Sequence, residues 1–73
     1  MNGYVIEKAS LDKSIGELRF HISQGFNTSD TGLKFMAFCR AQGIFKTLCI
    51  LNLLTESQII NYSADLTELE DVI

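Results

Sequence analysis

Two cysteines and a single histidine are the nitrogen and sulfur side chains of this sequence that could bind zinc or take part in nucleophilic catalysis. Cys39 and Cys49 are ten residues apart, and a turn at Gly43 would bring them to the same level of two antiparallel segments. A structural zinc site needs four ligands, whereas this chain has neither a CxxC pair nor a second histidine. We therefore predict no metal and no cofactor, and we expect reduced cysteines that act as small buried apolar side chains.

Recognisable catalytic groupings are also missing from the sequence. His21 has no serine or cysteine beside it in a nucleophile motif. Glu68, Glu70 and Asp71 could transfer protons, but they are clustered at a chain end, where we expect no apolar pocket around them. The spacing of the glycines matches neither GxGxxG nor the Walker pattern. The sequence therefore predicts a protein that is not an enzyme.

The charges of the chain are unevenly distributed. Six Lys and Arg residues stand against nine Asp and Glu residues, and all six cations precede residue 47. The last nine residues, DLTELEDVI, carry four carboxylates and no cation. A net charge of −3 opposes binding to nucleic-acid phosphates, so nucleic acid is the less favoured partner. The acidic end instead predicts a tail that binds an unidentified protein partner and consists of Leu66, Glu68, Leu69, Glu70 and Asp71.

The stretch GIFKTLCILNLL, residues 43–54, is the most apolar part of the chain. Eight of its twelve residues are medium or large apolar groups. Spanning a bilayer needs about 20 such residues, and extending the stretch backwards brings in Lys34, Arg40 and Lys46, which are costly in lipid. We therefore predict no membrane span, and a beginning without signal-peptide features predicts a cytoplasmic protein.

Hydrophobic periodicity predicts a first helix that starts at residue 10 and ends at Gly25. A possible capping box, Ser14 with Glu17, would move its start to residue 14. The same region also allows a β interpretation, because apolar and polar residues alternate in ELRFHIS. The alternative fold is therefore α+β, with an N-terminal hairpin and strands at residues 4–9, 17–23 and 45–53.

A second helix is predicted over residues 31–42, capped by Ser29 or Asp30 and ended by Gly43. Its inward face is expected to carry Leu33, Met36, Ala37 and Ala41. Residues 44–54 favour a third helix because they are rich in leucine. Thr55 and Gln58 form a capping box that predicts the start of a fourth.

Together these elements predict a single domain, residues 1–73, with an all-α fold of three or four short helices. A helix that is apolar on every side needs neighbours on every side, and so small a bundle leaves each helix an exposed flank. We therefore expect self-association, most simply as a two-fold dimer. The predicted interface consists of Phe35, Phe38, Phe45, Leu48, Ile50, Leu51 and Leu54.

The function that these expectations favour is that of a non-enzymatic protein-interaction module, such as a regulator, adaptor or inhibitor, which acts as a homo-oligomer. The alternative is a nucleic-acid-binding regulator of the helix-turn-helix type, with Gly43 in the turn. That alternative requires the six cations to gather on one face despite the negative net charge.

Overall fold

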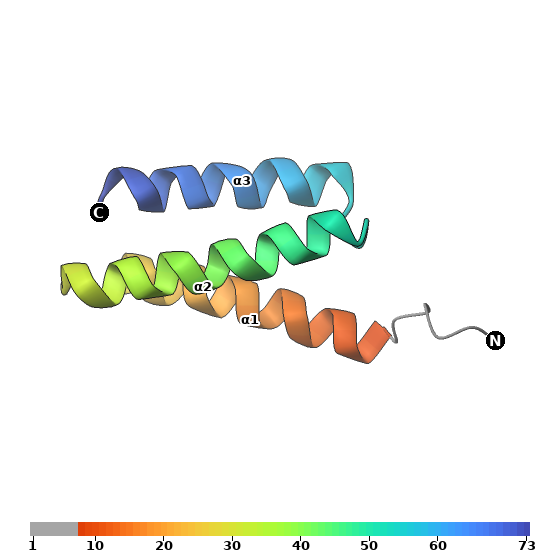
Figure 1. Ribbon diagram of the computed structural model, residues 1–73, viewed down its shortest axis with the longest axis horizontal. Coiled ribbons are helices and arrows are strands. Elements are labelled where there is room, and N and C mark those ends of the chain that lie inside the picture. Colours follow the sequence, from red (N-terminus) through yellow and green to blue (C-terminus); the bar gives the residue numbers. More distant parts are fainter. Residues whose placement is uncertain (1–7) are drawn as a thin grey trace.

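Three α-helices make up the fold. The computed structural model describes residues 8–73, which contain α1 (Lys8–Asn27), α2 (Thr31–Ile50) and α3 (Glu56–Asp71) and no strand (Figure 1). The prediction of an all-α fold is confirmed. The α+β alternative is wrong, because residues 17–23 lie in α1 and residues 45–50 lie in α2. Residues 4–7 of its first predicted strand lie outside the described part of the chain, and the rest of that strand is helical.

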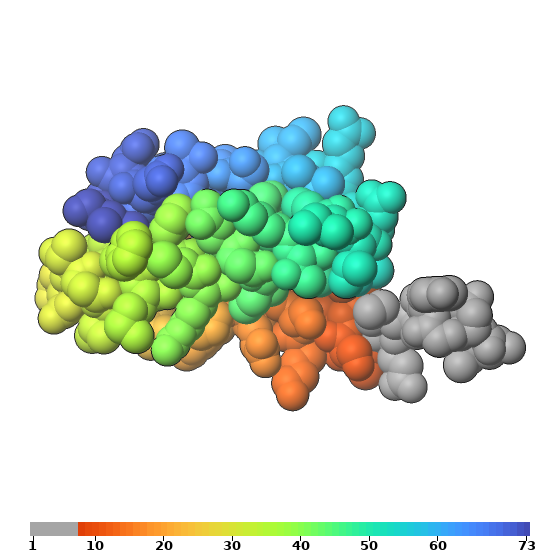
Figure 2. Space-filling model, viewed as in Figure 1, coloured from red at the N-terminus to blue at the C-terminus, as the bar shows by residue number. Residues whose placement is uncertain are grey.

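The helices run up, down and up again. α1 and α2 form an antiparallel hairpin, and α3 returns along α2 in the direction of α1 (Figure 1). The α1–α2 contact is the most extensive of the three, while α3 packs on both of its neighbours over a smaller area. In the view of Figure 2, α2 fills the middle of the surface between α3 and α1. One side of α2 is therefore open to solvent.

Gly43 lies inside α2, so the prediction that one helix ends there and another begins is wrong. The helix instead continues because Ala41 and Leu48, on either side of Gly43, are both anchored in the core. It ends at Ile50, where Asn52 takes a left-handed φ of 59°. Asn52 N donates to Cys49 O and Leu53 N donates to Leu48 O, each at 3.0 Å, which together form a Schellman motif.

The beginning of α1 also differs from the prediction. Lys8, the first residue that the structure describes, is already helical, so Ser14 and Glu17 lie inside α1 and their capping box does not form. At the other end α1 passes through Gly25 and stops at Asn27. The turn of α1 into α2 is thus only three residues long, residues 28–30.

The two predicted caps that depend on contacts within one helical turn are confirmed. Asp30 Oδ1 accepts a hydrogen bond from Leu33 N at 2.9 Å, which makes Asp30 the N-cap of α2. Thr55 Oγ1 accepts from Gln58 N at 3.1 Å, and Thr55 N donates to Gln58 Oε1 at 2.9 Å. These two hydrogen bonds between Thr55 and Gln58 form the reciprocal capping box predicted for α3.

A single apolar core joins the three helices. Its buried members are Leu18 and Ile22 from α1, Phe38, Ala41 and Leu48 from α2, and Leu66 and Leu69 from α3. Leu33 and Met36, which were expected on the inward face of α2, are exposed, and Phe38 takes their place beside Ala37 and Ala41. Small alanine side chains allow α2 to approach α1 closely, and this sets which side of the helix faces inwards.

Gly25 marks the tightest packing of the core. A Cβ atom at this position would lie 2.7 Å from Leu69 Cδ2 and 3.4 Å from Ala37 Cβ. The Gly25 carbonyl accepts a hydrogen bond from Lys34 Nζ at 2.7 Å. Carbonyl groups in the last turn of a helix have no partner within the helix, so Lys34 satisfies a group that would otherwise lack one. Gly25 thus joins all three helices at one end of the molecule.

Candidate functional site

The two cysteines are far apart. Cys39 and Cys49 belong to the same continuous helix, so their ten-residue separation corresponds to about 15 Å along its axis. A disulfide requires Cα atoms within about 7 Å of each other. The predicted approach of the two thiols across a turn at Gly43 is therefore wrong. Cys39 is also exposed, contrary to the expectation of a buried side chain, whereas Cys49 is partly buried.

His21 is a packing residue in this structure. Its ring meets the Phe20 ring edge-on, with centroids 5.4 Å apart and an interplanar angle of 69°. His21 Nδ1 is buried and makes no hydrogen bond with residues 8–73. Across the same residues, no group of three His, Cys, Asp or Glu side chains is arranged to hold a metal ion. In residues 8–73, none of the helices is both long enough and apolar enough to cross a bilayer.

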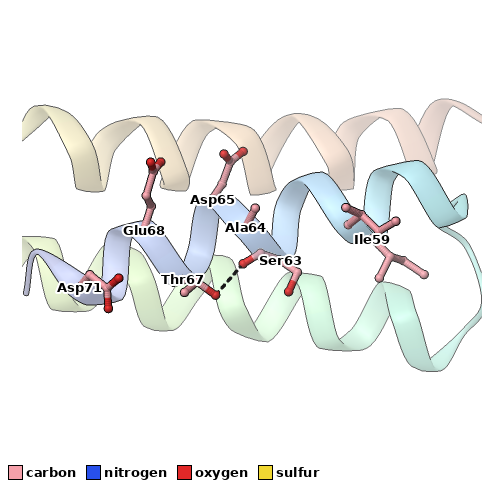
Figure 3. A pocket seen from close by; sticks show the side chains of 8 residues that line it. Ile59, Ser63, Ala64, Asp65, Thr67, Glu68 and Asp71 are labelled. Carbon is pink, nitrogen blue, oxygen red and sulfur yellow. Dashed lines mark hydrogen bonds between the residues drawn. The ribbon is translucent and has the colours of Figure 1, made fainter.

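A wide, open hollow lies along the outside of α3 and has a volume of about 820 Å3 (Figure 3). It is lined by Ile59, Ile60, Ser63, Ala64, Asp65, Thr67, Glu68 and Asp71, all from one helix. Small side chains form its floor, and Thr67 Oγ1 donates to Ser63 O at 2.9 Å (Figure 3). A substrate pocket encloses most of its ligand, but a depression on a single helix cannot. It is therefore an open depression on the surface and not an enclosed pocket.

A second hollow, between α2 and α3, is much smaller. Its volume of about 150 Å3 falls below the range of about 300–1,000 Å3 that is usual for ligand pockets. Phe38, Phe45 and Leu66 form its apolar wall, and Lys46 and Glu70 lie at its edge. It is therefore a groove of the helix packing.

The structure divides the predicted partner-binding tail in two. Leu66 and Leu69 are buried and hold α3 against α1 and α2, so they are not available to a partner while this fold persists. Glu68, Glu70 and Asp71 are exposed. In Figure 3 the carboxylates of Asp65 and Glu68 point to one side of α3 and that of Asp71 to the other. The accessible part of the tail is thus its acidic part.

The predicted self-association residues are divided in the same way. Phe38 and Leu48 belong to the core, and Phe45 and Leu54 are half-buried against it. Phe35, Ile50 and Leu51 are exposed, with exposed fractions of 54%, 82% and 53%. Two further exposed apolar side chains, Leu33 and Met36, were expected to face inwards. These five exposed residues, Leu33, Phe35, Met36, Ile50 and Leu51, are called the α2 outer patch below.

The alternative function depended on a turn at Gly43. Because α2 is continuous there, no helix-turn-helix is formed at that position. Lys34, one of the six cations, is engaged with the Gly25 carbonyl and is not free for a phosphate. No protein-family model matches the chain, and no curated protein or solved structure shows a significant similarity to it. The function must therefore be argued from the surfaces of the molecule.

Proposed function

We propose that this chain is a small non-enzymatic interaction module that acts in the cytoplasm as a homo-oligomer, most simply a two-fold dimer, formed through the α2 outer patch. The observation that carries the proposal is the exposure of five large apolar side chains on one 20-residue helix and its C-cap. An apolar side chain exposed alone is ordinary, but a group of them marks an interaction surface.

The size of the patch fits a dimer interface. A large apolar side chain has roughly 200 Å2 of accessible surface, so the exposed fractions of the five residues amount to about 600 Å2 per subunit. A standard interface buries about 800 Å2 on each partner, and about 65% of that area is apolar in homodimers. The summed exposed area of the five side chains is therefore comparable with the apolar part of such an interface.

The second part of the proposal concerns α3. This helix carries Glu56, Asp65, Glu68, Glu70 and Asp71 and no Lys or Arg. A surface of one sign favours partners of the opposite sign and speeds their encounter. Self-association through α2 leaves the acidic outside of α3 available to a basic partner protein, as expected of a regulator, adaptor or inhibitor.

Sedimentation equilibrium over a micromolar concentration range tests the proposal. The wild-type chain is expected to sediment as a dimer, and Ile50→Lys is expected to weaken the dimer at least about tenfold because it places a cation in an apolar interface. Lysine suits the last turn of a helix, so Ile50→Lys leaves the subunit folded. The matched control is Phe20→Lys, which replaces a side chain of α1 that is 60% exposed. A wild-type chain that is monomeric throughout this range would refute the proposal.

A further inference from the structure

Six residues follow one another along the exposed side of α2 at intervals of four, three, four, three and four. They are Gly32, Met36, Cys39, Gly43, Lys46 and Ile50, and all six are exposed. Intervals of four and three keep residues on the side of a helix that packs against another helix. These six residues are called the α2 seam, and they lie on the side of α2 that is turned away from the buried Ala37, Ala41 and Leu48.

Packing within the subunit does not account for Gly43. Apart from its chain neighbours and the backbone of the same helix, nothing lies within 4 Å of the position that its Cβ would take, and no glycine of residues 8–73 has a positive φ. A glycine in a helix interior costs about 1 kcal/mol relative to alanine. Such a residue is useful where another backbone must come close. Another helix backbone could come close at the centre of the seam, because Cys39, one turn before Gly43, is also small and exposed.

We propose that α2 of a second copy packs antiparallel on this seam, with the two-fold axis at the level of Ala41. The inference rests on the proposed self-association and specifies its geometry. The seam is symmetric about residue 41, so in this arrangement Gly32 faces the partner's Ile50, Met36 faces the partner's Lys46, and Cys39 faces the partner's Gly43.

Shape favours this arrangement. Ile50 is 82% exposed and has the largest exposed fraction among the large apolar side chains of residues 8–73. In the antiparallel pair it lies over Gly32, which has no side chain to obstruct it. At the centre, Cys39 and Gly43 are both small and let the helices approach. Thr47 Oγ1 donates to Gly43 O at 2.9 Å, so the hydroxyl beside the seam already has a partner.

Charge favours the same arrangement. In a parallel pair Lys46 would lie directly opposite the partner's Lys46, and like charges in that position repel. In the antiparallel pair the aliphatic part of Lys46 covers Met36, and its ammonium group reaches solvent. Antiparallel helices also place opposite ends of their dipoles next to each other. Shape and charge thus identify the occupant of the open side as a second copy in one orientation.

Disulfide crosslinking between two variants tests the orientation. The first variant, Cys49→Ser, keeps Cys39 as its only thiol. The second, Cys39→Ser/Cys49→Ser/Gly43→Cys, carries its only thiol at position 43. The two are mixed at equal concentration and oxidised mildly, and the products are separated by mass. Because each chain has one thiol, no disulfide forms within a chain and every product reports a contact between chains.

In the antiparallel dimer the mixed product is expected to form roughly tenfold faster than either self-product, because only residue 39 and the partner's residue 43 come within disulfide distance. Faster formation of the two self-products would show a parallel dimer and overturn the inference while leaving the proposed function intact. A dimer that forms no crosslink of either kind would also overturn it. A wild-type chain that sediments as a monomer refutes the proposed function and the inference together.

Discussion

Gly25 and Gly43 are both interior helix glycines, but their surroundings are opposite. Gly25 is buried at the junction of the three helices, where Leu69 and Ala37 leave no room for a side chain. Gly43 is exposed on the open side of α2, where a side chain would meet nothing. The first glycine is explained by contacts within the subunit and the second is not. The junction at Gly25 is therefore complete in one chain, whereas the open side around Gly43 is where we propose that a second chain packs.

The largest expected loss of stability is at the junction of the three helices around Gly25. Leu69→Ala removes a side chain with no exposed surface and leaves a cavity between the helices, so we expect a loss of about 2–5 kcal/mol in the free energy of unfolding. Urea denaturation followed by circular dichroism measures it. The matched control on the open side is Leu33→Ala, where the side chain is 56% exposed and the change should stay within about 0.5 kcal/mol. Similar losses of unfolding free energy for the two variants would show that the junction and the open side of α2 do not differ in packing.

Gly25→Ala is expected to have the next largest effect. The added methyl group lies 2.7 Å from Leu69 Cδ2, and overpacking of this kind costs about 1–3 kcal/mol, less up to about 1 kcal/mol gained in helix propensity. In the Leu69→Ala background the collision is absent, so the same substitution should be neutral or stabilising. A double-mutant cycle measures this coupling. Additive effects of the two substitutions would show that the contact is not responsible.

Lys34→Met should lower the free energy of unfolding by about 0.5–2.7 kcal/mol. It keeps the aliphatic part of the side chain and removes the ammonium group that donates to the Gly25 carbonyl. A hydrogen bond from a charged donor contributes about 1.5–3 kcal/mol, and relief from the unfavourable cation in the first turn of α2 returns about 0.3–1 kcal/mol. Lys13→Met, at an exposed position of α1, is the matched control. Equal stability of the two variants would exclude a role for this hydrogen bond.

The smallest change in subunit stability is expected at Gly43, and it has the opposite sign. At concentrations where the chain is monomeric, Gly43→Ala should raise the free energy of unfolding by about 0.5–1 kcal/mol, because it only improves helix propensity. Gly43→Leu should also leave the monomer folded, yet it should weaken the dimer by holding the two helices apart. Thermal denaturation and sedimentation equilibrium measure the two effects. A Gly43→Leu dimer as tight as wild type would show that no helix packs at this position.

Features that depend on neighbours within one helical turn could be predicted from the sequence. The Asp30 cap and the capping box of Thr55 with Gln58 are of this kind, since in each hydrogen bond the donor and the acceptor are three residues apart. The glycines could not be interpreted in the same way. Gly25 and Gly43 were both expected to end helices, because the sequence does not reveal that anchored residues on either side keep a helix continuous.

The candidate interface was predictable in kind but not residue by residue. The sequence shows that residues 43–54 carry more apolar side chains than one face can hold. Because apolar side chains occur on every side of α2, its hydrophobic pattern has no preferred direction, and the inward side is selected by the close contact of Ala37 and Ala41 with the rest of the core. This selection placed Phe38 and Leu48 inside and left Ile50 outside, which the pattern alone could not distinguish.

The three-residue connection between α1 and α2 has a consequence for the order of folding. Two long helices joined by so short a loop can begin to pack next to the turn, where the loop to be closed is shortest, and extend their contacts one helical turn at a time. Near the loop, the hydrogen bond from the Lys34 side chain to the Gly25 carbonyl further stabilises the hairpin. We therefore expect the hairpin to be the nucleus of folding, on a microsecond to millisecond timescale, with α3 docking afterwards onto a surface that is already formed.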